Sequence, residues 1–200
     1  MIAGILLLIL TACGRKERPV SKRDLQKYVN DPRHGLAQQT SVADVDVRLT
    51  FEPSDLLVAH DLVTGGNRDT VKFNLLQRKY SGNYYFLLRF SKGHKELLRQ
   101  LPSFGEYSEM VEVLSFRMQQ YVNLTTDRDT LPMSDYAYEQ TYGFGDANTL
   151  LIAFPKMGVT GKDKFDVNLA ECGFGIGSVK FSFRKADLEK VPELDYSKLN

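Results

Sequence analysis

Apolar and polar residues alternate in several short segments of this chain. Every second residue from 45 to 51 is apolar and the residues between are polar, which predicts a half-buried strand. The same period of two predicts strands over 71–75, 165–169 and 179–183. Residues 84–90 are apolar on both faces, as in a central strand, and we expect them to pair with 71–75 as a hairpin.

Helical periodicity is strongest over 107–114, where apolar residues recur three, four and seven positions apart. Ser21, followed by the acidic Asp24, predicts the capped start of a second helix, which ends at the turn residues from Asn30 onward. A third short helix is predicted over 56–62, directly after a proline and two capping residues. The helices are therefore expected to be few and short.

These elements predict an α+β or mainly β fold class. Roughly six to eight strands with two or three short helices suit an antiparallel β-sandwich-like single domain. We expect this domain to cover residues 21–200 and to follow a tether over 13–20. Further short strands are predicted at 116–124, around 136–142 and at 150–154. The order of the strands does not follow from these patterns.

The start of the chain has the pattern of a signal peptide. Residues 1–12 carry no charge, and the apolar run over 5–10 is too short to span a bilayer, which takes roughly 20 apolar residues. The run ends in Leu10-Thr11-Ala12-Cys13, which resembles the lipobox of bacterial lipoproteins. This resemblance implies removal of 1–12 and attachment of acyl chains such as palmitate to Cys13, and two or three such chains hold a protein stably in a bilayer.

One departure from the signal-peptide pattern bears on this interpretation. No Lys or Arg precedes the apolar run, although signal peptides normally begin with a positive patch. The alternative is a buried N-terminal strand or helix with an unmodified core cysteine, but the polar, basic segment 14–19 follows at once. Gly14 stands where enteric lipoproteins of the inner membrane have Asp. The resemblance therefore implies a protein of the cell envelope that is lipid-anchored at the outer membrane.

Two further segments are similar to uncharacterised lipoproteins of Bacteroidota. One is the opening YVNDP at 28–32 with Gly35 and Leu36, and the other is the glycine-rich turn before VKF at 179–181. This similarity implies a location in the envelope rather than an activity.

Charge and cysteine content narrow the possible partners. Acidic and basic residues are interspersed, and the formal net charge is +1, which speaks against a nucleic-acid partner. The chain has two cysteines, and a lipid on Cys13 would leave Cys172 without a partner for an intramolecular disulfide. Stability is expected to come from the apolar core.

No motif predicts a cofactor or a metal ion. Gly173, Gly175 and Gly177 are spaced like a phosphate loop, but a strand rather than a helix follows them, which favours a tight hairpin or bulge. The turn around Asp127 and Asp129 lacks the additional carboxylates of a calcium loop. The three histidines are far apart in the chain and form no metal-ligand pair.

No catalytic residue is predicted either. A thiol enzyme needs an exposed cysteine beside a histidine, whereas Cys172 at a strand end favours burial. No serine lies in a strand-turn-helix elbow. A carboxylate pair for glycoside hydrolysis is left open, because such a pair forms in space rather than along the sequence.

Three functions are left, in order of preference. The first is a membrane-anchored, non-enzymatic binding or assembly component of the envelope, which contacts a partner protein through sheet edges or through Tyr84, Tyr136, Tyr138 and Tyr142. The second is a carbohydrate- or small-ligand-binding lipoprotein of an uptake system. The third is an envelope hydrolase. An exposed apolar patch favours the first, an aromatic pocket the second, and facing carboxylates in a cleft the third.

Overall fold

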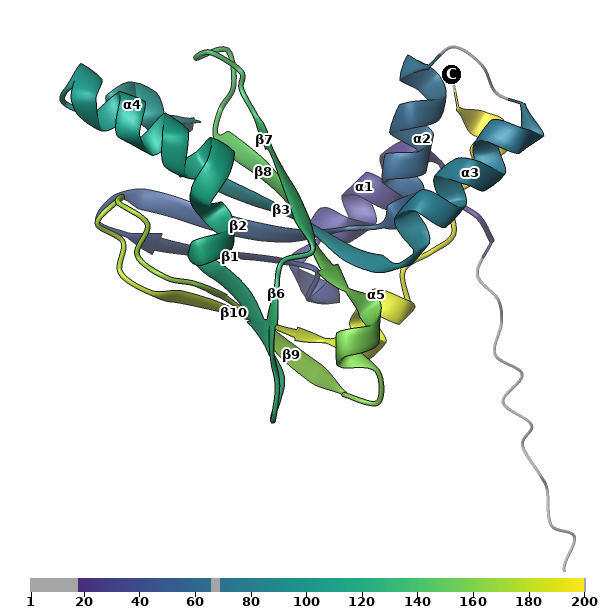
Figure 1. The fold of residues 1–200 in the computed structure, drawn as a ribbon. Coiled ribbons are helices and arrows are strands. Elements are labelled where there is room, and N and C mark those ends of the chain that lie inside the picture. The colour runs from purple at the N-terminus through teal and green to yellow at the C-terminus, as the bar shows by residue number, and fades with distance from the viewer. Residues whose placement is uncertain (1–17, 66–68, 200) are drawn as a thin grey trace, which may run out of the picture.

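Two antiparallel β-sheets form the centre of the computed structural model, which describes residues 18–65 and 69–199 (Figure 1). The large sheet has the order β1-β2-β3-β8-β7, with β4 paired to β3, and the small sheet has the order β10-β9-β5-β6. The strands are β1 Ala37–Val42, β2 Val45–Glu52, β3 Asn83–Lys92, β4 Lys95–Glu96, β5 Val122–Thr125, β6 Thr130–Pro132, β7 Asp135–Glu139, β8 Asn148–Pro155, β9 Lys164–Leu169 and β10 Val179–Arg184.

Five α-helices lie around these sheets in the described ranges, more than the two or three expected. In Figure 1, α1, α2 and α3 gather to the right of the sheets and α4 lies to the left. A π-helical turn, Val113–Arg117, continues α4. The helices are α1 Lys22–Asn30, α2 Ser54–Thr64, α3 Thr70–Ser81, α4 Phe104–Glu112 and α5 Lys185–Glu189. Short 3-10 turns are Pro32–His34, Leu98–Gln100, Met118–Gln120, Lys156–Val159 and Tyr196–Lys198.

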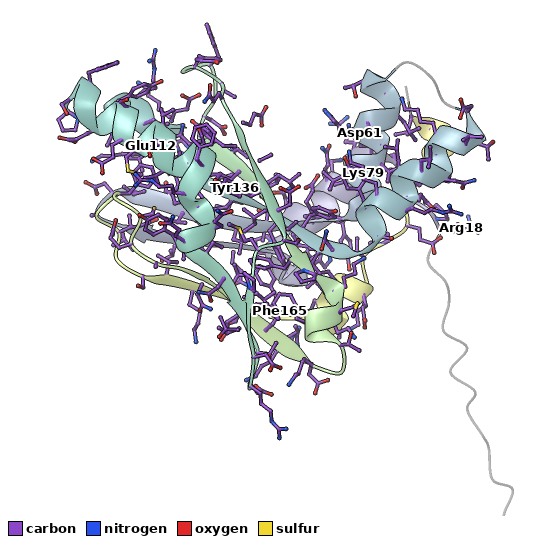
Figure 2. The ribbon with its side chains drawn as sticks, viewed as in Figure 1. Arg18, Asp61, Lys79, Glu112, Tyr136 and Phe165 are labelled. Carbon is purple, nitrogen blue, oxygen red and sulfur yellow. The ribbon has the colours of Figure 1, made fainter. Side chains whose placement is uncertain are left out.

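The core lies between the inner faces of the two sheets. Phe86 of the large sheet contacts Phe183 of the small one, with ring centroids 5.0 Å apart, and Phe165 completes the cluster at 6.2 Å from Phe86. All three rings are buried, and Figure 2 labels Phe165. The α+β fold with two antiparallel sheets agrees with the predicted fold class.

One side chain joins an edge of each sheet. Gln38 of β1 donates a hydrogen bond to the backbone oxygen of Ser182 of β10 and accepts one from the Ser182 amide at 3.2 Å. This contact links the edge strands β1 and β10 of the two sheets, which do not themselves pair as strands.

Most predicted elements are present. The alternating segments at 45–51, 165–169 and 179–183 are β2, β9 and β10, and 84–90 is the centre of β3, between β2 and β8. Ser21 caps α1 by accepting a hydrogen bond from the Asp24 amide at 3.2 Å, as predicted.

The strand predicted over 71–75 is wrong, because this segment lies within helix α3. Asp69 caps the helix by accepting from the Lys72 amide at 2.6 Å. The residues that pack on the core are Phe73, Leu76 and Tyr80, spaced three and four apart, so the helical period decides the structure. The expected hairpin with β3 is absent, and an ion pair between Asp61 and Lys79, 3.1 Å apart, joins α3 to α2 instead (Figure 2).

One other expectation changes. Most of the strand predicted at 116–124 is helical turn, and only Val122–Thr125 forms β5.

None of the helices in 18–65 and 69–199 is long and apolar enough to cross a membrane. The signal peptide over 1–12 and the lipidated Cys13 lie outside the described residues.

Candidate functional site

The outer face of the large sheet carries polar side chains at its centre. In β2, apolar residues point into the core, while Arg48 and Glu52 lie on the opposite face. The strand register places Arg48 directly opposite Arg89 of β3, and Arg89 opposite Thr149 of β8. Like charges opposite each other on neighbouring strands repel, so this pair of arginines costs stability unless other groups compensate it.

A groove of about 560 Å³, here called the outer-face groove, lies over these residues. Helices α1 and α2 form one wall, and the segment from β7 to β8 forms the other. A smaller hollow of about 180 Å³ continues from it and shares Arg48, Arg89 and Asp146. Residues that line the groove include Gln26, Asn30, Leu56, Leu87, Glu139 and Thr141.

The two arginines of the groove have different partners. Arg89 forms an ion pair with Asp146, which neutralises its charge. Arg48 donates to the side-chain oxygens of Asn30, at 2.8 Å, and Thr50, at 3.3 Å. Neither of these groups is charged, so within the described chain Arg48 has no carboxylate partner. The guanidinium of Arg48 keeps further N–H donors for a ligand.

Glu52 ends β2 and lines the groove at a distance from the arginines. No described group donates a hydrogen bond to its carboxylate. Burial raises the pKa of Glu52 to about 7, against the weaker opposite effect of the Lys22 charge on α1. A cation beside such a partly desolvated carboxylate would stabilise its ionised form.

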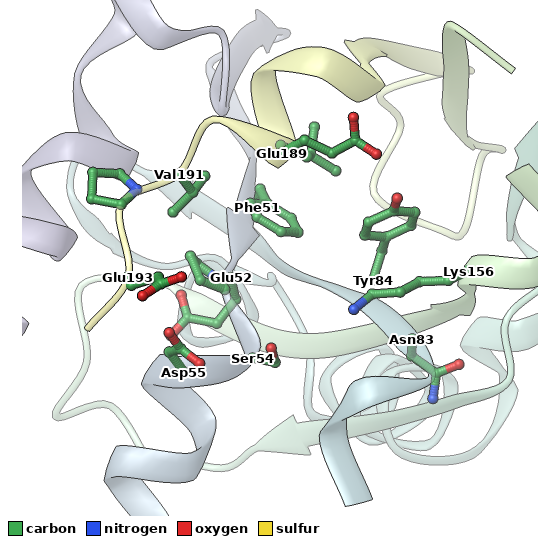
Figure 3. A pocket seen from close by; sticks show the side chains of 13 residues that line it. Phe51, Glu52, Ser54, Asp55, Asn83, Tyr84, Lys156, Glu189, Val191 and Glu193 are labelled. Atoms are coloured by element: carbon green, nitrogen blue, oxygen red, sulfur yellow. The ribbon is translucent and has the colours of Figure 1, made fainter. Parts of the chain in front are cut away.

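Glu52 also lines a second hollow, of about 360 Å³, at the C-terminal segment of the chain (Figure 3). In Figure 3 Glu52 and Asp55 lie on one side of it, and Tyr84 and Lys156 on the other. The Lys156 ammonium is 5.5 Å from the centre of the Tyr84 ring, and burial lowers the pKa of Lys156 although the Asp55 charge opposes this. Asp55 accepts from the Tyr196 hydroxyl at 2.9 Å, which gives it a structural role.

The wall between β7 and β8 is fixed by the buried Glu96, of which 3% is exposed. Its carboxylate accepts hydrogen bonds from the Thr141 hydroxyl, the Gly143 amide at 2.8 Å and the Gly145 amide at 3.2 Å. The aromatic rings on this loop point outward, since Phe144 is 96% exposed and Tyr142 67%. One buried carboxylate therefore orders a loop that both lines the groove and presents aromatic residues.

The glycine-rich segment binds a carboxylate of the chain itself. Glu171 accepts hydrogen bonds from the amides of Gly173 at 2.7 Å, Gly175 at 2.9 Å and Gly177 at 2.5 Å. Burial alone raises the pKa of Glu171, but these amides, together with that of Phe174, outweigh it and lower the pKa. The glycines connect β9 to β10, as the hairpin interpretation predicted. Their amides already bind the Glu171 carboxylate.

The other residues that the sequence analysis considered for chemistry are buried or make structural contacts. Cys172 is buried, and burial, with the Glu171 charge, raises the pKa of its thiol to about 12, so it is protonated at neutral pH. His34 stacks on Tyr28, with ring centroids 3.6 Å apart. Asp129 closes the β5–β6 turn and pairs with Lys162 at 3.8 Å. Among the residues that the structure describes, no group of His, Cys, Asp or Glu could hold a metal ion.

Three of the four tyrosines predicted as a contact surface are buried or partly buried. Tyr84 is buried beside Phe165, and Tyr136 and Tyr138 pack partly against the core. The Tyr138 hydroxyl accepts a hydrogen bond from Asn148 at 3.1 Å. Tyr142 is the one of the four whose ring is mostly exposed. The groove residues were missed, and their only signal in the sequence is the polar half of the alternation in β2.

Comparison with known proteins gives no match: no family model fits the chain, and no curated protein or solved structure is significantly similar to it. The function is therefore inferred from the site geometry.

Proposed function

We propose that this chain is a non-enzymatic binding protein of the cell envelope, lipid-anchored at the outer membrane through Cys13, and that it binds its ligand in the outer-face groove. The observation that carries the proposal is Arg48, which lines this groove and has only neutral hydrogen-bond partners in the described chain. An arginine next to a second arginine, with only neutral partners, supplies donors that a ligand can use.

The size and order of the groove support ligand binding. A volume of about 560 Å³ lies within the range of roughly 300 to 1,000 Å³ of small-molecule sites. The buried Glu96 orders one wall, and an ordered site loses less entropy when a ligand binds. Hydrolysis receives less support, because Asp55, which neighbours Glu52 in the second hollow, is already bonded to Tyr196.

A second candidate is binding of an envelope protein through the loop between β7 and β8. The supporting observation is the exposure of Phe144 and Tyr142 on a loop that Glu96 holds in place. Exposed aromatic residues on a rigid support give much contact area at small entropic cost. This candidate corresponds to an assembly role and the groove to a ligand-binding role.

The anchor is tested by Cys13→Ala. We expect the wild type to incorporate an alkyne analogue of palmitate and to sediment with membranes, and the variant to lose both properties. Cys172→Ala, which removes the other cysteine, is the matched control and should label like the wild type. Labelling of the Cys13→Ala variant at the wild-type level would contradict the anchor.

The groove is tested by co-purification from detergent-solubilised native envelopes, with mass spectrometry of bound proteins and small molecules. We expect Arg48→Gln to lose a discrete species that the wild type retains. Arg128→Gln removes the same charge at the exposed β5–β6 turn and should retain it. Retention of every species by Arg48→Gln contradicts the groove proposal, and loss with Phe144→Ala instead supports the loop.

A further inference from the structure

We propose that the ligand of the outer-face groove is a short peptide with a free amino group and a free carboxylate, bound with its carboxylate at Arg48 and its amino group at Glu52. This inference rests on the proposed function and names its ligand class. It follows from three properties of the groove: a cationic end, an anionic end, and the distance between them.

The cationic end is the pair of arginines. Asp146 neutralises Arg89, whereas Arg48 is left with neutral partners in the described chain. Of the other carboxylates near this end, Asp46 accepts a hydrogen bond from the Ser41 hydroxyl, and Glu139 is exposed and lies two strands from Arg89 in the register. The uncompensated charge is therefore that of Arg48, and a guanidinium binds a carboxylate through two parallel hydrogen bonds.

The anionic end is Glu52, which has no hydrogen-bond donor among the described residues. The Lys22 charge acts to lower the pKa of Glu52, but the two side chains form no ion pair. Glu52 is partly buried and lines both the outer-face groove and the second hollow. An ammonium group at this position would gain a charge-assisted hydrogen bond and would compensate the desolvation of Glu52.

The spacing fits a peptide of about three residues. Arg48 and Glu52 lie on the same face of β2, four positions apart, which corresponds to about 13 Å. An extended tripeptide spans about 10 Å, and the long arginine side chain covers the remainder. Between the charged ends, Thr50 lies opposite Leu87 in the register. Asn30 lies on the wall, where its side-chain oxygen accepts from Arg48 and its nitrogen donates to the Gln26 carbonyl.

The test uses the full chain in detergent and isothermal titration calorimetry at pH 7.5 with three probes: trialanine, N-acetyl-trialanine and trialanine amide. We expect trialanine to bind at least tenfold more tightly than either blocked peptide. Arg48→Gln should weaken trialanine to the level of the amide, and Glu52→Gln should weaken it to the level of the acetylated peptide. Arg48→Lys, which keeps the charge, should recover part of the affinity, and Arg128→Gln should leave it unchanged.

Equal affinities for the three peptides, or no binding of any of them at millimolar concentration, would overturn this inference. If no peptide binds but Arg48→Gln still loses a species from native envelopes, the ligand class is wrong and the groove proposal stands. If no peptide binds and Arg48→Gln loses nothing, both are wrong.

Discussion

Replacing Glu96 by alanine is expected to lower the free energy of unfolding by about 3 kcal/mol, because the change leaves buried donors without an acceptor. The carboxylate is the acceptor for the Thr141 hydroxyl and for the amides of Gly143 and Gly145. Alanine also opens a cavity where the side chain was. Urea unfolding followed by circular dichroism measures the loss.

Hydrogen exchange separates this local role from general destabilisation. In the Glu96→Ala variant the amides of Gly143 and Gly145 should exchange much faster than in the wild type, while those of the central strand β3 change little. Glu109→Ala, an exposed glutamate on α4, is the control. Slow exchange at both glycines in Glu96→Ala would contradict the role of Glu96 in ordering the loop.

The same variant connects loop order to ligand binding. Thr141 and Gly145 line the outer-face groove, so the wall becomes mobile when Glu96 is lost. A mobile wall has to be ordered on binding, which costs affinity although Glu96 itself does not line the outer-face groove. Weaker ligand binding in Glu96→Ala, with Arg48 and Glu52 intact, is the consequence.

Strands β2, β9 and β10 were predictable because each has one face in the core. Burial imposes a period of two on 45–51, 165–169 and 179–183, and a single sequence displays that period directly. The segment 71–75 displays it by coincidence. Its outward-facing Val71 and Leu75 are exposed apolar residues of α3, and they complete an alternation that has no part in packing.

The candidate site was not predictable, because tertiary pairing creates it. Arg48 and Arg89 are far apart in the chain, and only the β2–β3 register brings them opposite each other. The glycine-rich turn shows a related limit. Its spacing suggests a loop that binds an anion, and this interpretation of the amides is sound, but the anion is Glu171 of the same chain. A sequence pattern identifies donors without identifying their acceptor.

The second large effect is expected from Glu52→Gln, which should stabilise the chain at high pH. Burial raises the pKa of Glu52 from 4.5 to about 7, so between these values the folded chain holds a proton that the unfolded chain has released. Folding of the wild type therefore becomes less favourable as the pH rises from 4.5 to 7. Below this range both forms are neutral, and the variant and the wild type should be equally stable.

At pH 8 the variant should exceed the wild type by on the order of 2 kcal/mol, because glutamine carries no charge to desolvate. Urea unfolding at pH 4, 6 and 8 measures the difference, and Glu109→Gln on the exposed face of α4 controls for the lost charge. A difference that stays constant with pH would mean that Glu52 is fully solvated. Ionisation of this carboxylate destabilises the free chain, and an ammonium group of a ligand beside it would remove this cost.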